Sequence, residues 1–180
     1  MAGGPVTQVD ERYPIGKFTP VPSLTPEDRK ARIDQIATAP AAFRKAVAGL
    51  NDKQLDTPYR AGGWTVRQVA HHLPDSHMNA YMRFKWGLTE ATPTIKTYEE
   101  KDWAKTPETS APIAFSLDLL TSLHERWITL LRAMPPADFA RTIKHPDLGL
   151  ISLDTLVALY SWHGRHHTAH VTSLRERMGW

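Results

Sequence analysis

Four histidines lie within eight residues near the C-terminus, in the stretch SWHGRHHTAH at 161–170. If this stretch is helical, His163 and His167 are stacked one turn apart on the same face, because residues i and i+4 are neighbours on a helix. Their face continues the apolar stripe of the segment, so both side chains should point inward. Neutral imidazoles are common ligands of zinc and other divalent ions. The spacing therefore predicts that His163 and His167 provide two ligands of a metal site.

Other interpretations of this stretch remain open. His166 and His170 form a second i, i+4 pair, displaced toward the flank of the helix, where we expect them to be exposed or to donate hydrogen bonds to the ligands. The inward pair could instead form a hydrogen-bonded polar patch in the core, or an acid-sensitive switch without metal. Burial and mutual repulsion keep close imidazoles neutral, which leaves a lone pair for a cation. We therefore favour metal binding.

A third ligand must come from another helix, and the stretch AHHLPDSH offers three candidates. The apolar period places His77 near the middle of the stripe and His71 and His72 on opposite flanks. Periodicity therefore favours His77, although a bend at Pro74 would change this projection. His124 is a further candidate whose side chain should point partly inward. It could equally be a structural histidine, hydrogen-bonded at the edge of the core.

The elements that position these histidines are amphipathic helices. Thr25 can cap the first helix, Pro26 suits its first turn, and Pro40 should kink it or divide it in two. The second should end near Trp86, before Gly87. The predicted helices cover about 25–50, 65–86, 113–134 and 152–174.

Four amphipathic helices pack naturally as a four-helix bundle, so the predicted fold class is all-α. We expect an extended N-terminal segment at 1–24 and a single domain at 25–180. Residues 88–112 should form a long irregular crossover, a candidate for a site lid or a partner contact. Residues 139–151 could form a small hairpin around Pro146 and Asp147.

Composition excludes several classes of protein and site. The 22 basic and 19 acidic residues are interleaved along the 180-residue chain, which argues against a nucleic-acid partner. No apolar stretch is long enough to span a membrane and no secretory signal is evident, so we expect a soluble, cytoplasmic protein. Because the chain has no cysteine, any metal must be held by nitrogen and oxygen atoms.

Two stretches resemble a known family. They are YRAGGWTVRQVAHHLPDSHMNAYMRFK at 59–85 and YSWHGRHHTAH at 160–170, and the chain is similar there to the YfiT-like branch of the DinB-like superfamily of metal-dependent hydrolases. The resemblance implies a DinB-like four-helix bundle with one divalent ion, nickel or zinc. It implies that His72 is the ligand from the second helix and that His163 and His167 are the pair from the fourth. On this resemblance we choose His72 over His77.

The chemistry implied by such a site is the activation of water or of a thiol, because three neutral ligands leave a coordination position open. Relatives of the family that the chain resembles include bacillithiol and mycothiol transferases. We therefore expect a hydrolase or a thiol S-transferase acting on a small molecule, and a purely structural metal site is the non-enzyme alternative.

No catalytic side chain is assigned from the sequence. Asp75 follows His72 closely, but its helix position predicts a solvated surface carboxylate. The resemblance also implies a homodimer. Trp86, Trp103 and Trp180, near the ends of segments, are candidate aromatic anchors for that contact.

Overall fold

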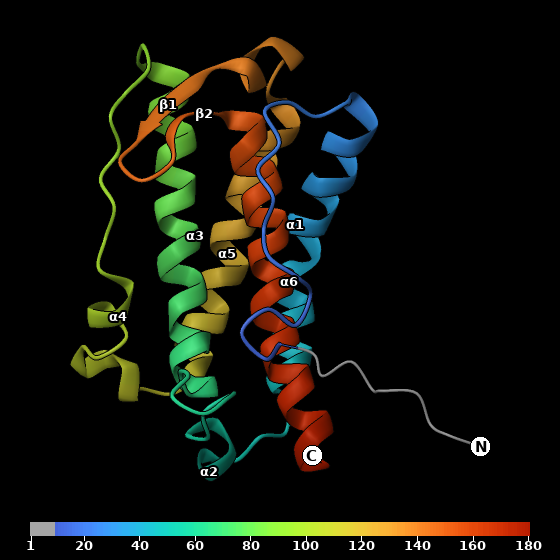
Figure 1. The fold of residues 1–180 in the computed structure, drawn as a ribbon, viewed down its shortest axis with the longest axis vertical. Coiled ribbons are helices and arrows are strands. Elements are labelled where there is room, and N and C mark those ends of the chain that lie inside the picture. The colour runs from blue at the N-terminus through green and yellow to red at the C-terminus, as the bar shows by residue number, and fades with distance from the viewer. Residues whose placement is uncertain (1–9) are drawn as a thin grey trace.

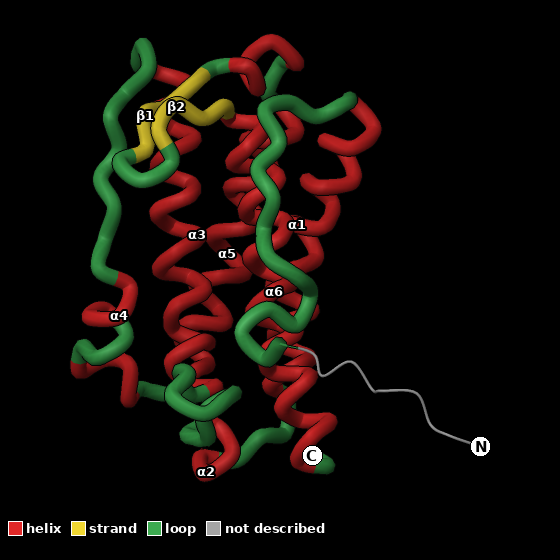
Figure 2. Tube along the Cα trace, in the orientation of Figure 1, coloured by secondary structure: helices red, strands yellow, loops and turns green. Residues whose placement is uncertain are grey.

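The computed structural model describes residues 10–180 and contains four long helices, which confirms the predicted all-α bundle (Figures 1 and 2). A small antiparallel sheet of two strands accompanies them. The long helices are α1 (Pro26–Val47), α3 (Val66–Thr89), α5 (Ile113–Ala133) and α6 (Leu153–Met178).

Side-chain caps explain where three of these helices begin. The Thr25 hydroxyl accepts a hydrogen bond from the Asp28 backbone N–H at the start of α1. Thr65 caps α3 in the same way, with Gln68 completing a capping box. Ser152 caps α6. Each cap pairs a backbone donor that the first helical turn leaves without an intrahelical partner.

The directions of the helices set the topology of the bundle. Arg29, near the start of α1, pairs with Asp154 at the start of α6, and Arg175 near the end of α6 donates to the Ala46 carbonyl near the end of α1. These two helices therefore run parallel. The helices α3 and α5 are also parallel neighbours, because His71 contacts Ser116 near both starts and later residues pair in the same order. Figure 1 shows both parallel pairs.

A long crossover follows from this arrangement, because the chain leaves α3 at one end of the bundle and must enter α5 at the other (Figure 1). We expected an irregular crossover, but part of it is helical. It contains the short helix α4 (Glu100–Trp103) and the 3-10 helix η1 (Pro107–Ser110). Its backbone also forms a bridge between Thr94 and Lys144.

The other connections are short. The helix α2 (Asp52–Leu55) was not expected, although a capping box of Asn51 and Gln54 marks its start. The 3-10 helix η2 (Pro136–Ala140) follows α5. The predicted hairpin is confirmed as β1 (Thr142–His145) and β2 (Gly149–Ser152), paired in antiparallel register.

Three residues expected to kink, bend or end helices lie inside them. Pro40 does not divide α1, and Pro74 lies within a continuous α3. The expectation that α3 ends before Gly87 is wrong, since the helix runs to Thr89. A Cβ atom on Gly87 would lie 2.8 Å from Leu153 Cδ2, so this glycine permits close packing rather than ending the helix.

The apolar core consists of two clusters. One is built around Phe84, Trp127 and Leu156, and the other around Phe43 and Leu73. On α3, α5 and α6 the segments that supply the two clusters are separated by a set of histidines, which we call the histidine layer: His72, His77, His124, His163 and His167. A polar layer therefore crosses the middle of the bundle.

The N-terminal segment 10–25 has no helix or strand and lies along α6 (Figure 2). The Val21 and Pro22 carbonyls accept hydrogen bonds from Thr155 and Ser152. Further down α6, the Trp162 indole donates to the Gly16 carbonyl. Positions 1–9 of the predicted extended segment lie outside the described residues.

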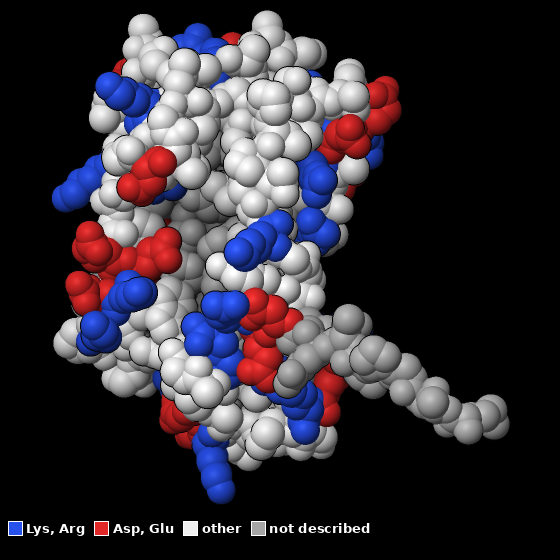
Figure 3. Space-filling view, viewed as in Figure 1, with Lys and Arg blue, Asp and Glu red and all other residues white. Residues whose placement is uncertain are grey.

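Two further features concern the charged side chains at the surface and the apolar character of the helices. On the face shown in Figure 3, basic and acidic side chains are interspersed. Across residues 10–180, no helix combines the length and the apolar character needed to cross a membrane.

Candidate metal centre

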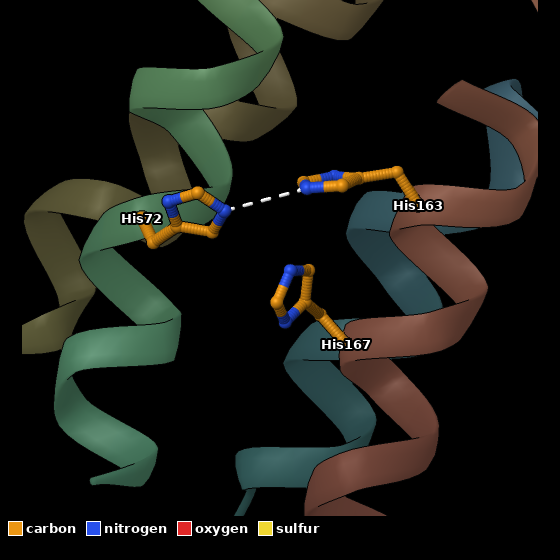
Figure 4. A group of neighbouring side chains, drawn as sticks. All are labelled: His72, His163 and His167. Atoms are coloured by element: carbon orange, nitrogen blue, oxygen red, sulfur yellow. Dashed lines mark hydrogen bonds between the residues drawn. The ribbon is translucent and has the colours of Figure 1, made fainter. Parts of the chain in front are cut away.

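Three histidines from two helices converge between the two apolar clusters. His72 comes from α3, and His163 and His167 come from successive turns of α6 (Figure 4). One ring nitrogen of each lies within 4.8 Å of the other two. The Nε2 atoms of His72 and His163 are 3.3 Å apart, and two imidazole nitrogens bound to a tetrahedral ion at about 2.05 Å are also separated by about 3.3 Å. The donor set therefore fits a divalent cation.

His77, which periodicity alone favoured, is not part of this group. Its side chain is 0% exposed and lies at the centre of the histidine layer. One ring nitrogen, Nε2, is 3.0 Å from Nδ1 of His163, and the other, Nδ1, is 2.7 Å from Nε2 of His124. Both nitrogens of His77 are therefore committed to neighbouring imidazoles.

These contacts form a chain that fixes which nitrogen carries the proton in His124, His77 and His163. The Ile36 carbonyl lies 2.8 Å from His124 Nδ1, and since a carbonyl only accepts, His124 carries its proton on Nδ1. Its Nε2 must then accept from His77 Nδ1–H, and His77 Nε2 must accept from His163 Nδ1–H. His163 Nε2 is left with a lone pair that points toward His72.

Pro40 explains why the Ile36 carbonyl is available inside a helix. In an α-helix the carbonyl of residue i binds the N–H of residue i+4, and proline has no N–H. Ile36 and Pro40 stand in this relation within α1. His124 therefore supplies the missing donor, and the chain of imidazoles crosses from α6 through α3 and α5 to α1.

A second chain fixes His167. His170 Nε2 lies 3.2 Å from the carbonyl of Arg12 in the N-terminal segment, so it must carry the proton there. Its Nδ1 then accepts from His167 Nδ1–H at 3.4 Å, which leaves the lone pair of His167 on Nε2. The His170 ring also stacks on Tyr59 with centroids 3.9 Å apart. His72 is oriented by packing, with the Trp64 ring 4.7 Å away edge-on.

The expectation that His166 and His170 are exposed is wrong, because their relative exposures are 6% and 3%. The N-terminal segment covers this flank of α6, and a helix projection of α6 alone does not include it. His166 stacks on Trp162 with centroids 4.2 Å apart and is tilted toward Tyr13. It is not among the three histidines that converge.

Burial keeps the cluster neutral. Desolvation lowers the pKa of His72 to about 4, and it lowers the pKa values of His163 and His167 well below the usual range. The same effect lowers the pKa of His77 and brings that of His124 to about 4. At neutral pH these imidazoles are therefore uncharged, each with a proton on one nitrogen and a lone pair on the other, as metal ligation and the two chains both require.

Asp75 differs from the solvated carboxylate that its helix position predicted. It is half-buried in α3, and desolvation, with a smaller contribution from Glu108, raises its pKa to about 6. The crossover packs over this side of α3, which the projection of an isolated helix does not include.

A cavity of about 410 Å³ opens beside the three converging histidines, and His163 forms part of its wall. It lies among α3, the crossover, the hairpin and α6, and Figure 3 shows a hollow in this face. Side chains that the sequence interpretation did not assign complete the wall, among them Arg83, Tyr98 and His145. Arg83 could have been found, because it lies eleven residues after His72 on the same helix face.

Removal of single imidazoles tests the ligand assignment. We expect His72→Ala, His163→Ala and His167→Ala each to reduce the metal content from one zinc or nickel ion per chain to a small fraction of that. The measurement is elemental mass spectrometry of untagged protein. His71→Ala is the control, since this buried histidine on α3 bonds Ser116 instead. Loss of the ion from His77→Ala but not from His72→Ala would contradict the assignment.

The chain through His77 gives a separate prediction. His77→Phe leaves the His163 Nδ1–H without an acceptor, so metal affinity should fall roughly 10- to 100-fold, as for other partners of metal-bound histidines. His77→Gln, which retains an acceptor, should recover part of the loss. The measurement is competition with a chelator, with His71→Phe as the matched control. Equal affinities in all four proteins would exclude the chain as a determinant of binding.

Comparisons with known proteins identify relatives over nearly the whole chain. The model of the DinB superfamily matches residues 35–171. A protein of Bacillus mycoides strain KBAB4 is 53% identical over 171 residues, which cover 95% of this chain and 99% of that protein. A protein of Bacillus cereus strain AH820 has the same identity and coverage. Both relatives are provisionally named metal-dependent hydrolases.

A solved structure shares the fold. YfiT from Bacillus subtilis superposes with a TM-score of 0.92 at 48% sequence identity, covering 94% of this chain and 98% of that one. It is described as "a probable metal-dependent hydrolase with an unusual four-helix bundle topology". The parallel pairs α1/α6 and α3/α5, the converging histidines and these relatives agree, and the chain belongs to the DinB superfamily, in its YfiT-like branch.

Proposed function

We propose that this protein is a metal-dependent hydrolase in which His72, His163 and His167 hold one zinc or nickel ion. The observation that carries the proposal is the convergence of two fixed lone pairs beside a cavity. The hydrogen-bond chains direct Nε2 of His163 and His167 toward the cluster, and His163 also lines the cavity of about 410 Å³. Three protein ligands next to a cavity are typical of catalytic rather than structural sites.

A divalent ion held by three neutral imidazoles supplies Lewis acidity for the activation of water. The surrounding residues bind and orient the substrate. Ser76 and Tyr160 contribute hydroxyl groups to the cavity wall. Burial raises the pKa of Tyr160, so its hydroxyl keeps its proton at neutral pH and can donate a hydrogen bond. The crossover forms one wall of the cavity.

The thiol S-transferase is the alternative use of the same site, because a Lewis acid also activates a thiol. The chain contains no cysteine, so the sulfur would arrive as part of a second substrate. Hydrolysis is preferred here because relatives 53% identical over nearly the full length bear the name of hydrolases.

The proposal is tested by comparing metal-loaded and metal-free protein on small aryl esters and amides, each with and without a panel of cellular thiols. We expect cleavage that depends on metal and not on thiol. His163→Ala should lower the rate of cleavage to the level of the metal-free protein, whereas His71→Ala should retain it. Thiol-dependent conjugation without cleavage would replace the hydrolase by the transferase. An inactive protein that merely unfolds on metal removal would favour a structural ion.

We also propose a homodimer, as the family resemblance implies. Trp86 and Trp180 are partly buried against the two core clusters, so Trp103, 40% exposed, is the most exposed of the three expected anchors. Light scattering at micromolar concentration should give a mass near twice 20.3 kDa. A monomer mass throughout that range would refute the dimer.

A further inference from the structure

Arg83 is a buried cation in the wall of the cavity. It is 6% exposed and lies on α3, on the helix face that also carries His72 and Ser76. Its Nη1 donates to the Tyr160 hydroxyl at 3.0 Å. Within residues 10–180 it forms no ion pair with a carboxylate, whereas the partly buried Arg29 at the same end of the bundle binds both oxygens of Asp154.

An unpaired guanidinium in such a place is costly. Buried charges in proteins are normally paired, because desolvation of an ion is not repaid by one neutral hydrogen bond. A guanidinium has five N–H donors, and the Tyr160 hydroxyl accepts from one of them. The remaining donors line a space large enough for a small molecule. Glu100 is near enough for the Arg83 charge to oppose the rise in its pKa that burial causes, but it forms no ion pair with Arg83, so an anion bound in the cavity would supply a close partner.

His145 adds a second donor to the same wall. Its Nδ1 accepts hydrogen bonds from the backbone N–H groups of Asp147 and Leu148, at 3.2 and 3.4 Å. The proton of the neutral ring is therefore on Nε2, which can donate. Since His145 and Arg83 line one cavity, a cation and a neutral N–H donor are available to the same ligand.

Acidic residues limit the charge that the ligand can carry. Glu99 and Glu100 of the crossover and Asp147 of the hairpin also line the cavity, together with Lys101. Figure 3 shows acidic side chains over the crossover beside the hollow. A dianion such as a phosphate monoester would place excess negative charge near these carboxylates. A single carboxylate matches one guanidinium in charge and in the planar geometry of its two oxygens.

We infer that Arg83, with His145, forms a subsite for the carboxylate of a small monoanionic substrate. The inference deepens the proposed function, on which it rests for the reaction but not for binding. Because Arg83 and His163 lie on different walls of one cavity, a carboxylate at Arg83 leaves the rest of the molecule to extend toward the three converging histidines. The protein would thus select carboxylate-bearing esters or amides over neutral ones.

The test uses benzoate and its neutral isostere benzamide, titrated calorimetrically into zinc-loaded and metal-free full-length protein. Benzoate should bind to both forms and benzamide more weakly. Arg83→Gln should weaken benzoate binding about tenfold or more, the loss expected for a charge-assisted hydrogen-bonded pair, and leave benzamide unchanged. Lys85→Gln is the matched control, because it makes the same charge change on an exposed position of α3. Arg83→Lys should recover part of the affinity.

A second variant keeps the inference testable if Arg83→Gln fails to fold. Glu100→Gln removes a nearby negative charge and should tighten benzoate binding roughly two- to fivefold, the size of an exposed charge interaction. Benzoate affinity that is the same in wild type, Arg83→Gln and Glu100→Gln would overturn the subsite and place the carboxylate elsewhere, such as on the metal. Benzoate binding that requires Arg83 in a protein that cleaves no ester would support the subsite while refuting the hydrolase.

Discussion

A polar layer in the middle of an apolar bundle is the constraint on which the rest of this structure depends. Burying imidazoles between two apolar clusters is costly unless their N–H groups find acceptors, since an unpaired buried polar group costs about 1–3 kcal/mol. Here each chain of rings ends on a backbone carbonyl, that of Ile36 in one case and that of Arg12 in the other. The layer thereby links all four long helices, and through His170 it also reaches the N-terminal segment.

Function follows from the direction of these chains. Because both terminal groups can only accept, protons are fixed on the far side of His163 and His167, and lone pairs are fixed on the near side. The same burial lowers the pKa values that would otherwise allow protonation to compete with a metal. Stability of the core and readiness to bind a cation thus depend on the same hydrogen bonds.

Local sequence signals predicted the helices and the inward pair of histidines, because caps, apolar period and i, i+4 spacing are properties of single segments. The choice of His72 needed the family resemblance, since His77 projects closer to the centre of the stripe. The structure places His77 in the core and His72 beside the α6 pair, and the identity of the ligands stays a prediction. A projection of one helix does not include the segments of the same protein that pack against that helix. The burial of His170, the environment of Asp75 and the role of Pro40 all depend on segments distant in sequence.

The positions of the imidazole protons test the two hydrogen-bond chains most directly. Long-range proton to nitrogen-15 correlation spectra of the metal-free protein at neutral pH assign the tautomer of each histidine. The two hydrogen-bond chains require neutral rings with the proton on Nδ1 for His163, His77 and His124, and on Nε2 for His170. A proton on Nε2 of His77, or a charged imidazolium at any of these four histidines, would contradict the proposed hydrogen-bond chains.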